Sequence, residues 1–139
     1  SEGPAAAAAS EEEEEARAHE GIARAGIAVL RSALPSMAAA LEECGEEYGV
    51  TLTGHSLGAG TATMCALELL AARARGGGDD EVLPPFWGKG EDDDADAEAK
   101  LASALRAVAS RDVDCWAYAP PPVFLGVPPP RRAHAPTGF

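Results

Sequence analysis

Long apolar runs are missing from this chain of 139 residues. A membrane-spanning helix needs about 20 mostly apolar residues, and a secretory signal peptide needs a basic segment followed by an apolar one. The sequence contains neither pattern, so we expect no spanning helix and no cleaved signal within it. Membrane helices would have to lie elsewhere in a longer parent protein, and the sequence assigns no cellular location.

The chain contains only three cysteines, an odd number. Cys44, Cys65 and Cys115 each stand among apolar residues of an expected helix or strand. An odd count leaves at least one thiol unpaired, and so few cysteines suit reduced thiols better than a disulfide framework. We therefore expect three reduced, buried thiols.

Cationic residues are also few. The chain has 11 Lys and Arg against 23 Asp and Glu, which gives a net charge of −12. A nucleic-acid-binding domain needs basic residues to contact phosphates, so binding to nucleic acid is not expected. A strongly anionic membrane surface would be repelled for the same reason. The length leaves room for one domain, and the sequence does not indicate an oligomeric state.

The most informative stretch that is present covers residues 50–62 and reads VTLTGHSLGAGTA. Its centre has the pattern G-x-S-x-G, formed by Gly54, His55, Ser56, Leu57 and Gly58. When a strand precedes this pattern and a helix follows it, the serine lies at a sharp, strained turn with its hydroxyl exposed. A Cβ at either glycine would collide across so tight a bend. The backbone N–H of Leu57 would then be one donor of an oxyanion hole at the start of a helix.

The residues on both sides of this turn agree with that arrangement. β-Branched Val50, Thr51 and Thr53 predict a strand over residues 50–53, and the small and apolar residues from position 57 to 70 predict a buried helix. The alternative interpretation is a glycine-rich turn before a buried helix, with Ser56 acting only as the N-cap.

The remaining pattern predicts an α/β fold with parallel strands and flanking helices. Apolar residues at steps of three and four indicate a helix over residues 21–44, kinked or split at Pro35. A second amphipathic helix is expected from about residue 97 to 111, and a strand over residues 113–118.

Low-complexity composition marks the boundaries of the folded part. Residues 1–18 form an acidic, Ala-rich tail, and residues 126–139 a Pro-rich tail. Between them, residues 19–125 are expected to fold, apart from a flexible acidic segment over residues 76–96. Phe86 and Trp87 in this segment have two interpretations, a lipid-interface or lid contact and, preferred, an aromatic pair folded back onto the core.

A family resemblance adds to this interpretation. GHSLGAGTA resembles the nucleophile elbow of the class 3 lipases, and most of all their sn-1-specific diacylglycerol lipase branch. His19-Glu20-Gly21-Ile22 and the stretch CWAYAPPPV over residues 115–123 resemble two further motifs of that family, in the same order. The resemblance implies a fragment of an α/β-hydrolase fold, an acylglycerol or other lipid ester as substrate, and Ser56 as the nucleophile.

A serine nucleophile also needs a base and an acid that orients the base. In the family the acid follows a later strand, whereas Asp112 and Asp114 stand at the beginning of the strand over 113–118. His134 falls in the Pro-rich tail, His55 is expected to pack beside the turn, and His19 precedes the first helix as a structural or cleft-lining residue. We therefore expect a partial lipase domain that hydrolyses little by itself. The alternative is a catalytically inactive remnant or binding module.

No cofactor is expected. A run of aspartates at positions 92, 93, 94 and 96 could bind Ca²⁺ only weakly, because it lacks the spaced ligands and the bend-forming glycine of a dedicated calcium loop. Solvated charge is the preferred interpretation of this run.

Overall fold

The computed structural model describes residues 17–76, 83–84, 87–88 and 94–125. The chain divides into two units. The larger unit, His19–Val123, contains every described residue of the candidate site. In the other unit, strand β1 (Arg17–Ala18) pairs antiparallel with strand β4 (Phe124–Leu125).

The larger unit begins with helix α2 (Glu20–Cys44), as the stripe of apolar residues predicts. His19 is its N-cap, and the His19 Nδ1 atom accepts a hydrogen bond from the Ile22 N–H at 3.3 Å. The expected split at Pro35 is wrong, because the helix is one continuous element, and the alternative of a kink at Pro35 stays a prediction. Pro35 itself is exposed, while Leu34 and Leu41 on the opposite face are buried and hold the helix on both sides of it.

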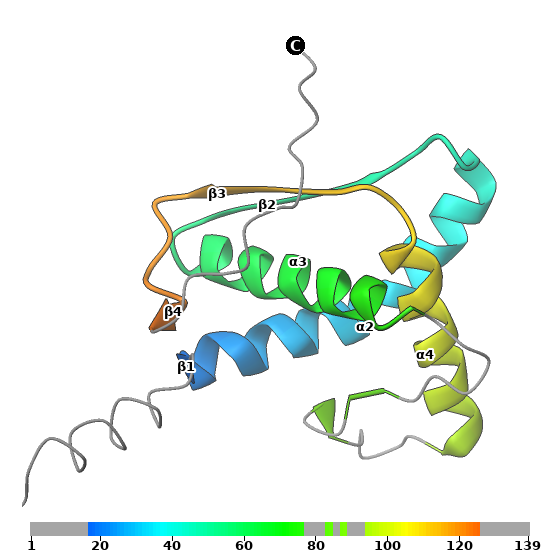
Figure 1. Ribbon diagram of the computed structural model, residues 1–139, viewed down its shortest axis with the longest axis horizontal. Helices are drawn as coiled ribbons and strands as arrows, with labels where there is room; N and C mark the ends of the chain where they lie inside the picture. The colour runs from blue at the N-terminus through cyan, green and yellow to red at the C-terminus, as the bar shows by residue number, and fades with distance from the viewer. Residues whose placement is uncertain (1–16, 77–82, 85–86, 89–93, 126–139) are drawn as a thin grey trace, which may run out of the picture. The chain divides into compact units, whose positions relative to one another are not determined.

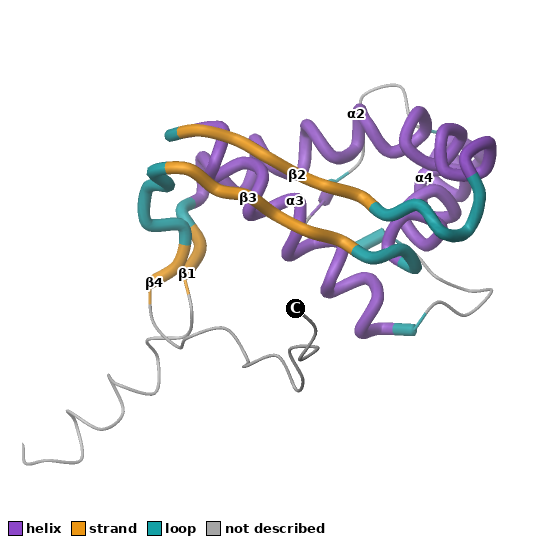
Figure 2. The backbone as a smooth tube through the Cα atoms, turned by 90° about the horizontal axis from the view of Figure 1, so that it is seen from above, coloured by secondary structure: helices purple, strands orange, loops and turns teal. Residues whose placement is uncertain are grey.

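Two parallel strands follow the predicted pattern. Strand β2 (Val50–His55) is two residues longer than expected, and strand β3 (Val113–Tyr118) has the expected bounds. Between them in sequence lie helices α3 (Leu57–Arg75) and α4 (Ala95–Ala109). The register pairs Val50 with Val113 and His55 with Tyr118. Figure 2 shows the two strands side by side, so the carboxyl ends of both meet at one end of the sheet.

The core lies between the sheet and the helices. Helix α3 runs under both strands and packs against α2, and α4 contacts both of these helices (Figure 1). A cluster of buried aliphatic side chains holds the three helices together, because burying each of them contributes about 1.5–3 kcal/mol. Its fully buried members are Leu30, Leu34, Leu69, Leu105 and Val108.

The other face of the sheet is exposed in the described part of the chain. Thr51, Thr53 and His55 alternate with the half-buried residues of β2, as a strand covered on one face requires. On β3, the side chains of Trp116 and Tyr118 are 60% and 57% exposed. Parallel sheets in complete domains are covered on both faces, so this arrangement is consistent with a fragment of an α/β-hydrolase fold.

The prediction of three buried thiols is correct only for Cys65. Cys44 and Cys115 are exposed, and all three are free cysteines. Cys44 is the last residue of α2, and Cys115 belongs to the part of β3 that the described elements leave accessible. An apolar sequence neighbourhood therefore did not imply burial at either position.

Candidate functional site

The corner between β2 and α3 is formed by Ser56. Its backbone has φ 55° and ψ −120°, a left-handed conformation that a residue with a side chain rarely adopts. Such strain costs on the order of 1–3 kcal/mol and persists only where the surroundings enforce it. The Ser56 N–H donates a hydrogen bond of 2.9 Å to the Tyr118 carbonyl oxygen, which ties the corner to the end of β3.

The two glycines of the G-x-S-x-G pattern differ in their surroundings. A Cβ at Gly54 would overlap the backbone of Gly58 and Ala59, because the strand and the helix approach each other closely there. A Cβ at Gly58 would have nothing within 4 Å. The expectation that both glycines prevent a collision is therefore correct for Gly54 and wrong for Gly58, which lies on the open side of the first helical turn.

The Ser56 side chain is exposed and makes no capping hydrogen bond to α3. Ser56 is the N-cap residue of α3 by position, but the side-chain hydrogen bond that this alternative requires is not formed. The Ser56 carbonyl oxygen accepts the N–H groups of Ala59 and Gly60. The N–H groups of Leu57 and Gly58 have no acceptor within the described ranges, so they remain available at the positive end of the helix dipole.

Three sequence stretches that are far apart in the chain meet around this corner. Gly60, in the first turns of α3, lies against the side chains of Ile22 and Pro121. The His19 N–H donates to the Val123 carbonyl oxygen at 3.0 Å. The beginning of α2, the corner and the segment after β3 therefore form one locality of the larger unit.

Sequence reasoning did not identify Ala119 as part of this locality. Ala119 directly follows β3 and has φ 49°, so a second residue with a side chain is held in the left-handed region next to the Ser56–Tyr118 hydrogen bond. The only signal in the sequence was that prolines follow it, which shows where the strand ends but not the sign of φ.

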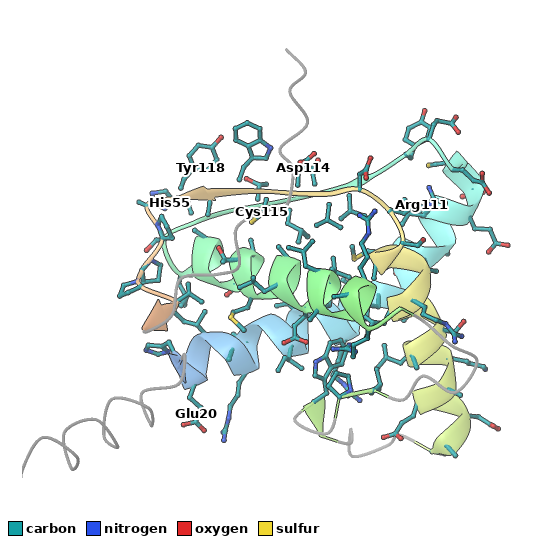
Figure 3. The ribbon with its side chains drawn as sticks, viewed as in Figure 1. Glu20, His55, Arg111, Asp114, Cys115 and Tyr118 are labelled. Carbon is teal, nitrogen blue, oxygen red and sulfur yellow. The ribbon has the colours of Figure 1, made fainter. Side chains whose placement is uncertain are left out.

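The candidate acids lie at the far end of the sheet. Asp114 pairs with Thr51, five residues before Ser56, which is roughly 16 Å at about 3.3 Å per residue. Asp112 precedes β3, and its carbonyl oxygen accepts the Val50 N–H. Figure 3 shows His55 and Tyr118 at one end of the strands and Asp114 towards the other.

No described histidine or carboxylate hydrogen-bonds to the Ser56 hydroxyl. The expectation that His55 packs beside the turn is wrong, because it lies on the exposed face of β2. His19 caps α2, as the structural interpretation requires. His134 lies outside the described residues.

No group of three or more His, Cys, Asp or Glu residues in the described part of the chain is placed to hold a metal ion. Asp94 is the N-cap of α4, and its Oδ1 atom accepts the Ala97 N–H at 2.8 Å. Asp96 lies in the first turn of the same helix, while Asp92 and Asp93 are outside the described ranges. Within those ranges, no helix is both long and apolar enough to span a bilayer.

Trp87 is buried, with 6% of its surface exposed. Its indole N–H donates a hydrogen bond of 2.9 Å to the buried carboxylate of Glu68 on α3. The preferred interpretation, in which the aromatic residue folds back onto the core, is confirmed for Trp87, and Phe86 lies outside the described residues.

Comparison with known protein families finds a match over much of the chain. The family model described as lipase (class 3) matches residues 4–82, which is more than half of the chain and includes α2, β2, Ser56 and α3. No curated protein and no solved structure matches the chain.

Proposed function

The chain belongs to the class 3 lipase family, and from this premise we propose that it acts on lipid esters through Ser56, with diacylglycerols or triacylglycerols as the substrate class. The observation that carries the proposal is the conformation of Ser56, a strained residue between a strand and a helix with an exposed hydroxyl. The CWAYAPPPV stretch, which resembles the diacylglycerol lipase branch, supports the choice of acylglycerols.

In the proposed reaction, the Ser56 Oγ atom forms a bond to the carbonyl carbon of the ester while its proton passes to a base. The Leu57 N–H donates to the oxyanion of the tetrahedral intermediate. The intermediate collapses, the C–O bond to the glyceride breaks, and the leaving alcohol takes the proton. Water then attacks the acyl-serine, which releases the fatty acid and restores the hydroxyl.

We expect this chain to supply the nucleophile and one oxyanion donor, but not the acid or the base. Asp112 and Asp114 are at the wrong end of the sheet, and no described histidine contacts Ser56. Loss of triad members lowers the rate by about 10⁴ to 10⁶. The isolated chain should therefore hydrolyse esters only slightly above background.

A second candidate function is a lipase-like binding module without catalytic activity. The observation that favours it is the same lack of a histidine or a carboxylate bonded to Ser56 in the described ranges. In that case the strained turn at Ser56 would be retained as part of the fold without a catalytic role.

Fluorophosphonate labelling with and without added imidazole separates the two candidates, because imidazole can replace a missing base. In the hydrolase, mass spectrometry should find the label on Ser56 and imidazole should increase its rate. Ser56→Ala should abolish labelling, and Ser36→Ala, an exposed serine on α2, should leave it unchanged. A folded chain in which Ser56 reacts no faster than Ser36, with imidazole or without, would overturn the proposal in favour of the binding module.

The missing base is tested separately with a p-nitrophenyl ester. Rapid turnover without imidazole that disappears in Ser56→Ala would contradict an incomplete triad, while supporting Ser56 as the nucleophile.

A further inference from the structure

The segment that follows β3 is fixed on both sides of Ala119. Before it, Tyr118 pairs with His55 at the end of the sheet. After it, the Val123 carbonyl oxygen accepts the His19 N–H, and the Val123 side chain is buried. Ala119 lies between these two anchors with its side chain exposed. Its contribution is therefore its backbone conformation and not the packing of its methyl group.

The peptide group between Tyr118 and Ala119 carries both the Tyr118 carbonyl oxygen and the Ala119 N–H. Because this group is planar, its rotation changes the φ of Ala119 and the direction of the Tyr118 carbonyl together. A half turn would bring the φ of Ala119 from 49° into the unstrained negative range. It would also point the Tyr118 carbonyl oxygen away from the Ser56 N–H, which donates to it at 2.9 Å. The positive φ of Ala119 is thus the condition under which this hydrogen bond forms.

The same hydrogen bond acts on the backbone of Ser56. The Ser56 N–H donates to the Tyr118 carbonyl oxygen, and this contact resists rotation about the Ser56 N–Cα bond and helps to keep φ at 55°. As long as His55 keeps the extended backbone of β2, a change in the φ of Ser56 turns its Oγ atom and the Leu57 N–H relative to the sheet. The direction of the Tyr118 carbonyl therefore influences where the serine hydroxyl points.

We propose that Ala119 is a positioning residue for the nucleophile, an inference that rests on the proposed function of Ser56. The left-handed backbone of Ala119 directs the Tyr118 carbonyl oxygen at the Ser56 N–H. That bond holds the Ser56 hydroxyl and the neighbouring oxyanion donor in the orientation for attack on an ester. Tyr118 contributes through its backbone, since its side chain is exposed on the face of the sheet away from α3 (Figure 3).

The first test follows the Ser56 N–H by amide hydrogen exchange in the whole chain, measured by NMR. Ala119→Val introduces a β-branched residue, which strongly disfavours a positive φ. We expect exchange at Ser56 to become about tenfold faster, the order of change that such added strain produces. The Val50 N–H, which donates to the Asp112 carbonyl oxygen at the other end of the two strands, is the internal reference and should exchange as before.

The second test measures fluorophosphonate labelling of Ser56 in the presence of imidazole. Ala119→Val should slow labelling by about tenfold. Ala119→Gly should slow it far less, because glycine adopts a positive φ without steric cost. Ala107→Val makes the same substitution at an exposed alanine of α4 and should change neither labelling nor exchange at Ser56. If circular dichroism shows that Ala119→Val does not fold, Ala119→Leu, which has no branch at Cβ, replaces it.

Three results would overturn the proposal. Ala119→Val could speed exchange at Ser56 and Val50 equally, which would show a general loosening of the sheet. Ala119→Gly could slow labelling as much as Ala119→Val does, or neither measurement could change. A folded chain that loses protection only at Ser56, yet is labelled at Ser56 in no variant, would instead overturn the proposed function and leave the coupling between Ala119 and Ser56 standing.

Discussion

Strain is concentrated at two residues on either side of one hydrogen bond. In the described part of the chain, Ser56 and Ala119 are the residues other than glycine with positive φ. They flank the contact between the Ser56 N–H and the Tyr118 carbonyl oxygen. Backbone strain of this kind gathers at sites where a side chain must be presented in one fixed direction. The strained backbone at these two residues therefore lowers the stability of the fold, and packing elsewhere must offset that loss.

The contrast between Gly54 and Gly58 gives a prediction for single substitutions. Gly54→Ala should destabilise the fold by about 1–3 kcal/mol or more, because the new methyl group meets backbone atoms that cannot move aside. Gly58→Ala should be neutral or stabilising by up to about 1 kcal/mol, since alanine is the better helix former and the space is open. Urea unfolding of both variants measures the difference, and equal losses would contradict the geometry of the corner.

Cys65 gives a prediction about pH. Burial raises the pKa of the Cys65 thiol from 9.0 to about 11, with a further contribution from Cys115. The unfolded chain therefore releases this proton near pH 9 and the folded chain near pH 11, so folding stability from this group is lost as pH rises between these values. Urea unfolding between pH 9 and 11 should show a steeper loss for the unchanged chain than for Cys65→Ala.

A thiol reagent supplies the control for this prediction. Cys44 and Cys115 are exposed and should react quickly at pH 8, whereas Cys65 is 3% exposed and should react slowly. The exposed Cys44→Ala variant should keep the pH dependence of the unchanged chain. If Cys65→Ala and the unchanged chain lose stability in parallel, the thiol is not the source.

At the scale of helices and strands, the end of α2 is held by a residue from the other end of the unit. The last turn of α2 contains no basic residue, and its C-cap is Gly45 with φ 105°. The Arg111 guanidinium, which follows α4, donates to the carbonyl oxygens of Leu41, Gly45 and Tyr48. One side chain thus caps α2 and fixes the connection that leads into β2.

Removing the Arg111 side chain should lower the free energy of unfolding more than substitutions near the surface usually do. Arg111→Met should lower the free energy of unfolding by about 1.5–3 kcal/mol, because charged hydrogen bonds to three carbonyls are lost. Arg24→Met removes a cation whose ion pair with Glu20 is largely exposed, and should cost less than about 0.5 kcal/mol. Thermal unfolding compares the two, and similar losses would show that Arg111 is not a cap.

Local pattern was sufficient to predict most of the elements. The period of apolar residues gave α2, and the β-branched residues before G-x-S-x-G gave β2 to within two residues. The same pattern predicted the strained corner at Ser56, because the turn is specified by neighbouring residues. The expected split of α2 at Pro35 is the exception, because whether a proline interrupts a helix depends on how the residues on both sides of it pack, and the sequence of one helix does not contain that packing.

For the molecule as a whole, what the sequence did not predict depends on contacts between distant segments. Burial of each cysteine depends on which face of the sheet is covered, and the open space at Gly58 depends on how α3 leaves the corner. The capping of α2 by Arg111 joins residues 70 positions apart in the case of Leu41. The role of Ser56 as a nucleophile remains a prediction, because reactivity depends on groups that the described residues do not place beside it.

The two tryptophans offer a probe of the whole unit. Trp87 is buried against Glu68, and Trp116 is 60% exposed on the sheet. Trp116→Phe should leave a blue-shifted emission that acrylamide quenches weakly, and Trp87→Phe should leave a red-shifted emission that is quenched strongly. Trp87→Phe should also cost about 1–3 kcal/mol more in stability, since the buried Glu68 loses its partner. Equal quenching of both variants would contradict the burial of Trp87.

The parallel pairing of β2 with β3 determines when the sheet can form during synthesis. Thr53 and Trp116 sit side by side although 63 residues separate them. At about 5–20 residues per second, the ribosome needs several seconds to deliver the second strand after the first has emerged. Until then β2 cannot pair with β3, and the hydrogen bond from the Ser56 N–H to the Tyr118 carbonyl oxygen cannot form.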